Sequence, residues 1–219
     1  MVLPRLLKAL TRYSLIRIEL EKCYSIHRMV QEVLRDGMDD TMRQQWLERA
    51  VEALNQVFPS GDFETWQHCK RLVTHVQTIE CHFTQLTHPA VSSGRLLNAA
   101  GYYLHDQGRY SEAEPLYLRS LSIREQQLGE QHPDVASSLN NLVGLYQSQG
   151  RYAEAEPLYL RALAILFDRL GKTHPNTQTV WRNFLYFLQQ VIQAGQTTQL
   201  SDHPWTQALL RQIEEQSGE

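Results

Sequence analysis

Apolar positions recur at helical spacing through the second half of the chain. Residues three and four apart share one face of a helix, so such stripes indicate amphipathic helices. Between two stripes lies Gln149-Gly150-Arg151-Tyr152, where Gly150 can take the left-handed conformation that ends a helix. The pattern predicts two antiparallel helices joined by a short turn. The stripes comprise Leu139, Leu142, Val143 and Tyr146, and then Ala155, Tyr159, Ala162 and Leu163.

This helix pair occurs twice. G-R-Y-S-E-A-E-P-L-Y-L-R-S-L-S-I starts at Gly108, and G-R-Y-A-E-A-E-P-L-Y-L-R-A-L-A-I starts at Gly150, which is 42 residues later. A fixed period of this size indicates stacked helical units. Within each unit, Ala113 or Ala155 marks the close approach of the paired helices, where a larger side chain would force them apart. Pro133 and Pro175 are expected in first helical turns, where their missing N–H costs nothing.

The repeat resembles the tetratricopeptide repeat, in the 42-residue form found in kinesin light chains. Residues 139–165 carry the pattern L-N-N-L-x-x-L-Y-x-x-x-G-R-Y-x-E-A-E-x-L-Y-x-R-A-L-x-I. The resemblance covers about 88–194 and implies a mainly α fold, a right-handed α-solenoid of antiparallel helix pairs. We expect two full repeats, 88–129 and 130–171, then a degenerate third repeat and a capping helix over 172–216.

The first 87 residues have a different pattern. Two short β-prone runs, Tyr13 to Ile18 and Cys23 to Ile26, enclose a charged turn and predict a β-hairpin. A helix is expected from about His27 to Arg35, so that residues 1–36 form a partial winged-helix remnant.

Two longer helices are expected in a linker over residues 37–87. The first runs from Met38 to Phe58 with Asp39 or Asp40 as its N-cap. The second runs from Phe63 to Leu86. The apolar face of the first comprises Met42, Trp46, Leu47, Ala50, Leu54 and Val57, and that of the second comprises Leu72, Val76, Ile79, Phe83 and Leu86.

This N-terminal part is similar to the winged-helix end and helical linker of bacterial NB-ARC (STAND-type) signalling ATPases. Y-S-L-I at Tyr13, S-I-H-R-M-V-Q at Ser25 and F-E-T-W-x-x-C-x-R-L at Phe63 carry the resemblance, which covers about 1–86. It implies that His27 contacts the β-phosphate of bound ADP, although Arg28 replaces the family's usual Asp. The sequence has no G-x-x-x-x-G-K-[ST] loop to cradle phosphates, so we expect this chain alone not to bind nucleotide. It is then either a C-terminal piece of a longer protein or a free-standing remnant.

Composition narrows the function classes. Hydrophobic residues make up 42% and charged residues 21%, which argues against wholesale disorder. The net charge of −3 disfavours nucleic acid, and no stretch approaches the roughly 18 to 20 apolar residues of a membrane helix. Three cysteines form no disulfide framework, so we expect a reduced, cytoplasmic protein.

Candidate chemical sites have simpler explanations. His68, His75 and His82 follow one another at seven-residue steps, which is about 10.5 Å on a helix, whereas metal ligands lie within about 4 Å of each other. His132 and His174 each precede a proline and are expected to cap helices. We expect the paired glutamates to form a solvated face, and we expect no enzyme, no cofactor and no metal. The glutamates are Glu112, Glu114, Glu154 and Glu156.

The concave surface that the repeat resemblance implies is the better candidate site. Asparagine presents a donor and an acceptor, so it can hold a peptide main chain of any sequence. The alternative is that Asn98 and Asn140 bond only to neighbouring helices. A Lys and Arg clamp for a carboxylate is not evident, because only Arg95 and Arg182 supply charge. The groove set comprises Arg95, Asn98, Tyr102, His105, Ser137, Asn140, Asn141, Gln147, Thr179, Arg182 and Tyr186.

We therefore interpret the chain as a non-catalytic protein–protein interaction module. The resemblances make it the sensor or regulatory arm of an NB-ARC/STAND-type signalling protein that binds a peptide or protein in its groove, with an NB-ARC ATPase domain in cis or in trans as a further partner. The alternative is a fragment or subunit of a nucleotide-hydrolysing STAND ATPase whose P-loop domain lies upstream or in trans. A third hypothesis is a structural oligomeriser.

Overall fold

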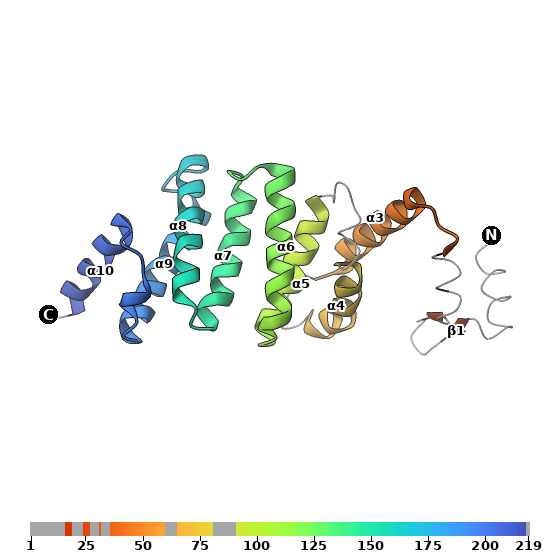
Figure 1. The fold of residues 1–219 in the computed structure, drawn as a ribbon, viewed down its shortest axis with the longest axis horizontal. Coiled ribbons are helices and arrows are strands. Elements are labelled where there is room, and N and C mark those ends of the chain that lie inside the picture. Colours follow the sequence, from red (N-terminus) through yellow and green to blue (C-terminus); the bar gives the residue numbers. More distant parts are fainter. Residues whose placement is uncertain are drawn as a thin grey trace. The chain divides into compact units, whose positions relative to one another are not determined.

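The computed structural model describes residues 16–18, 24–26, 31, 36–59, 65–80 and 91–217 (Figure 1). The chain divides into two units, 1–49 and 50–219. In the first, strand β1 (Ile16–Ile18) pairs antiparallel with β2 (Tyr24–Ile26), with Ile16 opposite Ile26. The turn between the strands and nearly all of the expected helix from His27 to Arg35 lie outside the described residues, so the winged-helix remnant stays a prediction.

Helix α3 (Asp40–Val57) begins where the sequence predicts. The carboxylate of Asp39 accepts a 2.7 Å hydrogen bond from the backbone N–H of Met42, so Asp39 is the N-cap. The predicted apolar face is partly wrong. Val51 and Phe58, which we had not assigned to it, are the buried side chains, while three members of the expected face are exposed. These three are Met42, Trp46 and Val57.

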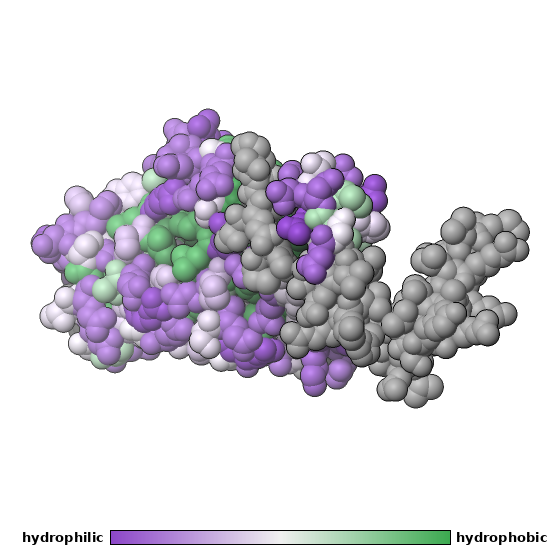
Figure 2. Space-filling view, turned by 45° about the vertical axis from the view of Figure 1, so that its right-hand side comes forward, coloured by the Kyte–Doolittle hydropathy of each residue, from purple (hydrophilic) through white to green (hydrophobic). Residues whose placement is uncertain are grey.

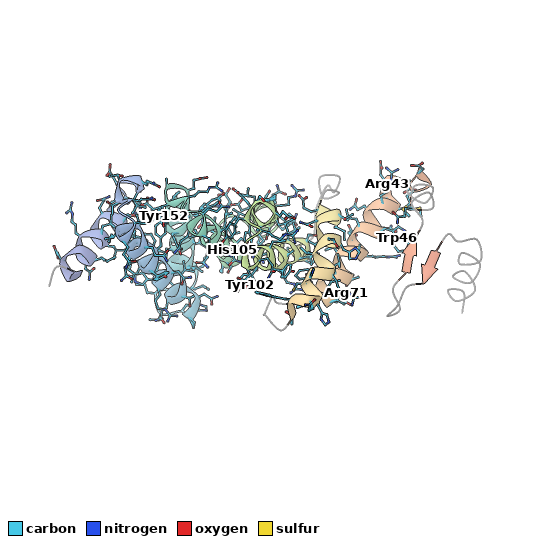
Figure 3. The ribbon with its side chains drawn as sticks, turned by 90° about the horizontal axis from the view of Figure 1, so that it is seen from below. Arg43, Trp46, Arg71, Tyr102, His105 and Tyr152 are labelled. Carbon is cyan, nitrogen blue, oxygen red and sulfur yellow. The ribbon has the colours of Figure 1, made fainter. Side chains whose placement is uncertain are left out.

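The reason for this error is that α3 carries apolar residues on more than one side. Val51 and Phe58 are seven residues apart, about two helical turns, and so lie on the same side of the helix. This side is rotated about the helix axis from the apolar face that the sequence predicted. The ring of Trp46 (Figure 3) instead lies beneath the guanidinium of Arg49, which is 5.3 Å from the ring centroid. In helix α4 (Trp66–Glu80), Val76 is buried as expected together with Cys69 and Val73. Leu72 and Ile79 are half-buried, and Phe83 and Leu86 lie outside the described residues.

The repeat part is a solenoid-like array of helices, as predicted. Each helix packs against the next one along the chain, most extensively α5 on α6 and α7 on α8 (Figure 1). In the space-filling view, hydrophilic residues cover most of this part and apolar ones show between them (Figure 2). The elements are α5 (Val91–Asp106), α6 (Tyr110–Leu128), α7 (Pro133–Ser148), α8 (Tyr152–Arg169), α9 (Pro175–Gln193), the 3-10 turn η4 (Thr197–Gln199) and α10 (Pro204–Ser217).

The turns and close contacts follow the repeat pattern. Gly108 and Gly150 end α5 and α7 with φ of 70° and 71°, the left-handed region that favours glycine. Ala113 and Ala155 are fully buried where the paired helices meet. Each alanine therefore occupies a position with no room for a longer side chain.

Histidines cap the helices that begin with proline. The Nδ1 atoms of His132 and His174 accept hydrogen bonds of 3.1 and 3.2 Å from the backbone N–H two residues later, which confirms the predicted capping role. His203 does the same at α10, with a bond of 3.3 Å. The His-Pro pair at 203–204 was the available signal for this third cap, and our sequence analysis missed it.

The prediction of a solvated glutamate face is wrong for Glu156. This carboxylate is 1% exposed, and the residues that cover it on α8 include Ser201, which follows η4, and Thr206 of α10. It accepts hydrogen bonds from the backbone N–H of Ser201 at 2.6 Å, the hydroxyl of Ser201 at 2.7 Å and the hydroxyl of Thr206 at 2.6 Å. A buried carboxylate is stable only when such donors surround it. Glu156 therefore anchors the last helix.

Candidate functional site

A cavity of about 600 Å³ opens on the surface formed by α5, α7 and α9. Six of the eleven predicted groove residues line it. Tyr102 and His105 come from α5 (Figure 3), and Tyr186 comes from α9. The remaining three all lie on α7 and are Asn140, Asn141 and Gln147.

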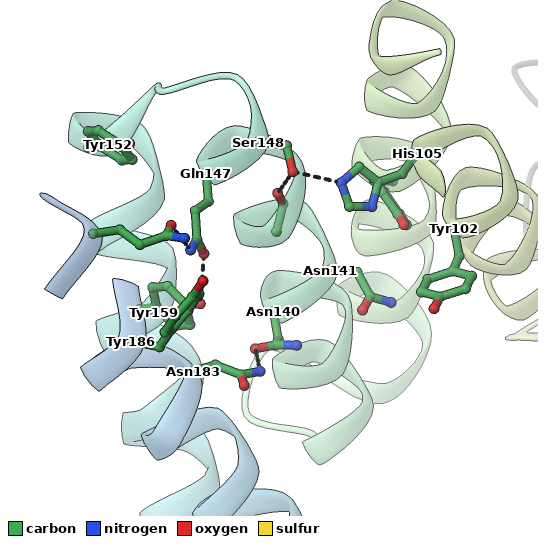
Figure 4. Close-up of a pocket in the computed structure, with 13 residues that line it drawn as sticks. Tyr102, His105, Asn140, Asn141, Gln147, Ser148, Tyr152, Tyr159, Asn183 and Tyr186 are labelled. Atoms are coloured by element: carbon green, nitrogen blue, oxygen red, sulfur yellow. Dashed lines mark hydrogen bonds between the residues drawn. The ribbon is translucent and has the colours of Figure 1, made fainter. Parts of the chain in front are cut away.

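Asparagines of α7 bond to asparagines of both neighbouring helices beside this cavity, and Figure 4 shows the pair formed by α7 and α9. Asn141 Nδ2 donates to Asn98 Oδ1 at 3.0 Å, and Asn183 Nδ2 donates to Asn140 Oδ1 at 3.3 Å. Bonding to neighbouring helices is therefore real. Each pair nevertheless leaves hydrogen-bonding atoms over, since Asn140 Nδ2 and Asn141 Oδ1 have no hydrogen bond within the described residues. Both atoms belong to half-buried side chains that line the cavity.

A second set of amides is satisfied. Gln147 Nε2 donates to Gln190 Oε1 at 2.6 Å, and Gln147 Oε1 accepts a bond of 3.3 Å from the hydroxyl of Tyr159. Gln147 therefore links α7 to α9 and also gives the buried phenol of α8 an acceptor. Both of its amide atoms are in use within the fold.

The equivalent position one repeat earlier is His105, and here the arrangement is incomplete. Ser148 Oγ donates to the carbonyl of Gly144 at 2.9 Å, so its 3.0 Å contact with His105 Nε2 requires the histidine nitrogen to donate. Burial lowers the pKa of His105, which favours this neutral ring. The hydroxyl of Tyr117, the counterpart of Tyr159, is buried and has no hydrogen-bond partner among the residues that the structure describes. In the second repeat Gln147 accepts the hydrogen bond of Tyr159, whereas in the first repeat His105 stands at that position and does not accept one from Tyr117.

The other five predicted groove residues lie outside the cavity. Arg95 donates to the side chain of Asn55 at 2.9 Å and to its backbone carbonyl, and Asn98 holds Asn141. Ser137 bonds within its own helix, to the carbonyl of Pro133 at 3.3 Å. Arg182 donates to Thr179 at 3.5 Å and lines a different cavity beside Phe167 and Trp181.

Sequence reasoning missed seven residues that line the cavity. Two of them could have been found from the 42-residue offset, because Gly144 shares its position with the predicted Tyr102 and Tyr186, and Asn183 shares its position with the predicted Asn141. Tyr117 and Tyr159 belong to the segment P-L-Y-L that occurs in both repeats, and the sequence analysis placed Tyr159 in an apolar stripe. The seven are Tyr117, Gly144, Ser148, Tyr152, Tyr159, Asn183 and Gln190.

Other candidate sites contribute little. Within the described parts of the chain, no three His, Cys, Asp or Glu residues come together as a metal site, and no helix is long and apolar enough to cross a membrane. His68 and His75 are exposed on α4. Cys69 is a free, buried thiol whose pKa is raised by burial. His27 and His82 lie outside the described residues.

Comparison with known proteins identifies the repeat. The family model for the tetratricopeptide repeat matches residues 92–166, which cover α5 to α8. These residues are tetratricopeptide repeats. The match agrees with the 42-residue period and with the helix pairs of the structure.

Relatives and solved structures extend the comparison. A nucleotide-binding leucine-rich repeat (NLR)-like protein of Hyaloscypha variabilis is 34% identical over 136 residues, 60% of this chain, and the chain spans 13% of that relative's length. BtubC (BKLC) from P. vanneervenii is 14% identical, with a TM-score of 0.48 over 78% of this chain and 84% of that one. A putative kinesin light chain of Podosopora anserina with nearly identical TPR-like repeats is 19% identical, with a TM-score of 0.48 over 80% and 87%.

Proposed function

We propose that this chain is a non-catalytic interaction module that binds a peptide or an extended protein segment in the cavity between α5, α7 and α9. The observation that carries the proposal is the set of unused amide atoms on half-buried asparagines at the cavity floor, Asn140 Nδ2 and Asn141 Oδ1. One atom donates and the other accepts, which are the two functions that a peptide main chain needs. The volume of about 600 Å³ lies in the range of ligand-binding clefts.

The regulatory setting of the module is a second part of the proposal. The NLR-like relative supports a place beside an NB-ARC or STAND-type domain, because this chain corresponds to a small share of that protein. The nucleotide-sensing role of His27 depends on such a domain, and so does the alternative of a fragment of a nucleotide-hydrolysing ATPase. Sequencing the gene upstream of Met1 distinguishes the alternatives. A P-loop in frame favours the ATPase fragment, and a stop codon with a ribosome-binding site favours a free-standing adaptor.

The groove assignment can be tested without knowing the natural partner. Peptides are selected from a displayed random library against the full chain, and their affinity for variants is measured by fluorescence anisotropy. Asn141→Ala removes one acceptor from the cavity, so we expect affinity to fall by about 2- to 12-fold, the equivalent of one hydrogen bond of roughly 0.5 to 1.5 kcal/mol. Gln126→Ala is the matched control, because this exposed amide of α6 lies outside the cavity and donates to Ser122 of its own helix.

Two results would contradict the proposal. One is a library that yields no specific peptide. The other is a set of selected peptides whose binding is weakened equally by Asn141→Ala and by Gln126→Ala. If instead the chain self-associates and groove substitutions leave that association unchanged, the structural oligomeriser is the better description.

A further inference from the structure

Three equivalent positions of successive repeats face the groove, and the middle one is a glycine without a side chain. At the 42-residue period, Tyr102 on α5, Gly144 on α7 and Tyr186 on α9 occupy the same position of successive repeats. Tyr102 and Tyr186 are 41% and 58% exposed and line the cavity. Figure 4 shows them on either side of Asn140 and Asn141, which belong to the helix that carries Gly144. The middle repeat therefore has an open space where each neighbour has a phenol ring.

The fold itself does not require glycine at this position. Gly144 lies inside α7 and is absent from the glycines with positive φ. A Cβ atom there would meet only Cε1 of His105, at 3.9 Å, which is ordinary contact. Gly101 differs, because a Cβ atom there would come within 2.9 Å of the Tyr117 ring. Since glycine destabilises a helix interior, Gly144 is explained by the space that it leaves rather than by packing.

The surroundings of this space select the kind of group that fits it. Five of the residues that line the cavity are tyrosines, and no Asp, Glu, Lys or Arg is among the described residues that line it. A charged group would lose hydration there without meeting an opposite charge. An aromatic ring would gain edge or stacked contacts with its neighbours, and a polar atom on the ring could bond to the spare amide atoms of Asn140 or Asn141.

We propose that the partner supplies the missing ring: an uncharged, tyrosine-type aromatic side chain of the bound segment occupies the space over Gly144, flanked by Tyr102 and Tyr186. This inference rests on the proposed function, because it names the residue class that the same groove recognises. The neutral His105 at the edge of the space, held by Ser148, adds no charge that would exclude the ring.

The experiment uses the full chain, labelled with ¹⁵N, and titrates it with N-acetyl-tyrosinamide. N-acetyl-leucinamide tests the need for a ring, and N-acetyl-phosphotyrosinamide tests the exclusion of charge. We expect saturable shifts of α7 amides around Gly144 with a dissociation constant on the order of 1 mM, in the range open to so small a ligand. Binding of the leucine and phosphotyrosine probes should be at least roughly tenfold weaker.

Two variants locate the site. Gly144→Tyr restores the ring that the other repeats carry and fills the space, so binding of the tyrosine probe should fall by at least roughly tenfold. Gln126→Tyr is the matched control, since it adds the same ring to an exposed position of α6 outside the cavity and should leave the affinity within about twofold. The thermal melting curve of each variant shows that it is folded.

The outcomes separate this inference from the proposed function. Absence of saturable binding, equal binding by Gly144→Tyr, or equal binding of the phosphorylated probe overturns the inference. If library-selected peptides still depend on Asn141 while any of these results holds, the groove is a peptide site and only the aromatic pocket is wrong. If neither peptides nor the probe bind in the groove, both proposals fail.

Discussion

The two sides of each repeat use polar residues differently. At the helix turns, Arg151 donates to Glu154 at 2.7 Å and to Glu114 at 2.9 Å, and Arg109 pairs with Glu112 at 2.7 Å. These bonds raise the pKa of Arg151 and hold the pKa values of Glu112 and Glu154 below their usual range. In the groove, Asn140 and Asn141 each bond to one neighbour and keep a second amide atom unused. Polar groups that complete one another hold the fold together, whereas groups left half-satisfied on a hollow surface are available to a partner.

The same position of the repeat can also serve two different purposes. Glu114 is followed by another repeat and pairs with Arg151 of that repeat. Its counterpart Glu156 is followed by the degenerate end of the array, where hydroxyls and a backbone N–H replace the guanidinium. The comparison shows that the end of the array keeps the glutamate but changes its partners.

The largest effect on stability should come from removing the buried carboxylate of Glu156. Glu156→Ala leaves three donors of the C-terminal segment without their buried acceptor, so we expect the free energy of unfolding to fall by about 3 kcal/mol. Glu114→Ala, which removes a half-buried ion pair, should lower it by about 1 kcal/mol. Urea denaturation measures both. Equal losses would show that burial of Glu156 does not matter.

A smaller loss is expected from overfilling the contact between paired helices. Ala155→Leu adds three heavy atoms to a fully buried position and should lower the free energy of unfolding by about 1 to 3 kcal/mol, whatever ligand is present. Ala153→Leu makes the same change at an exposed position of α8 and should shift stability by less than about 0.5 kcal/mol. Thermal and urea unfolding of the two variants provide the comparison, and equal stability would mean that the helices can move apart freely.

A gain in stability is expected when His105 of the first repeat is replaced by glutamine, the residue at the equivalent position of the second repeat. In His105→Gln, the amide can donate to Ser148 and accept from the Tyr117 hydroxyl, as Gln147 does for Gln190 and Tyr159. We expect the free energy of unfolding to rise by about 1 kcal/mol at pH 7. Urea denaturation measures the rise, and a loss would show that Tyr117 needs no acceptor. His68→Gln, on the exposed side of α4, is the control and should change little.

The same variant should alter the pH dependence. The pKa of His105 is lower in the folded protein than the unfolded value of about 6.5, so the unfolded state binds more protons below that pH. This contribution to stability is therefore complete above about pH 6.5 and is lost as the pH falls toward the folded pKa. Melting curves between about pH 7.5 and 5.5 should show a smaller loss for His105→Gln than for the wild type. Parallel curves would contradict the assigned shift.

The smallest expected change concerns the two glycines of the groove helices. Gly144→Ala should raise the free energy of unfolding by about 0.5 to 1 kcal/mol, because the position is helical and has room for a Cβ atom. Gly101→Ala should lower it, because the added atom would press on the Tyr117 ring. Differential scanning calorimetry of the pair distinguishes a glycine kept for packing from one kept for space. A loss of stability in Gly144→Ala would remove the basis of the aromatic pocket.

The repeat period made the array predictable, because identical spacing repeats identical contacts. The helix pairs, the left-handed glycines and the His132 and His174 caps all follow from residues within one unit. The burial of Glu156 does not, since it depends on α10 returning over a repeat some 45 residues away in sequence. The buried face of α3 was also missed, because its apolar residues lie on several sides and only tertiary packing selects one.

The groove was predictable in part for the same reason. The repeat resemblance indicated Asn140 and Asn141, but their bonds to Asn183 and Asn98 cross between repeats at an offset of 43 residues rather than 42. Which amide atoms remain unused therefore depends on the helix packing, not on the sequence period. The sequence alone shows that Gly144 stands where the neighbouring repeats have tyrosine. Only the cavity around Gly144 indicates that the space it leaves can hold a side chain of a partner.

The most direct test of the account measures the binding and the stability of Asn140→Ala together, with a library-selected peptide as the ligand. Only Nδ2 of Asn140 is unused, so the account predicts an affinity about 2- to 12-fold weaker than that of the wild type. Loss of the bond to Asn183 should lower the free energy of unfolding by no more than about 1 kcal/mol. A variant that unfolds much more easily but binds the peptide as tightly as the wild type would show that Asn140 is purely structural, and would contradict the groove as the binding site.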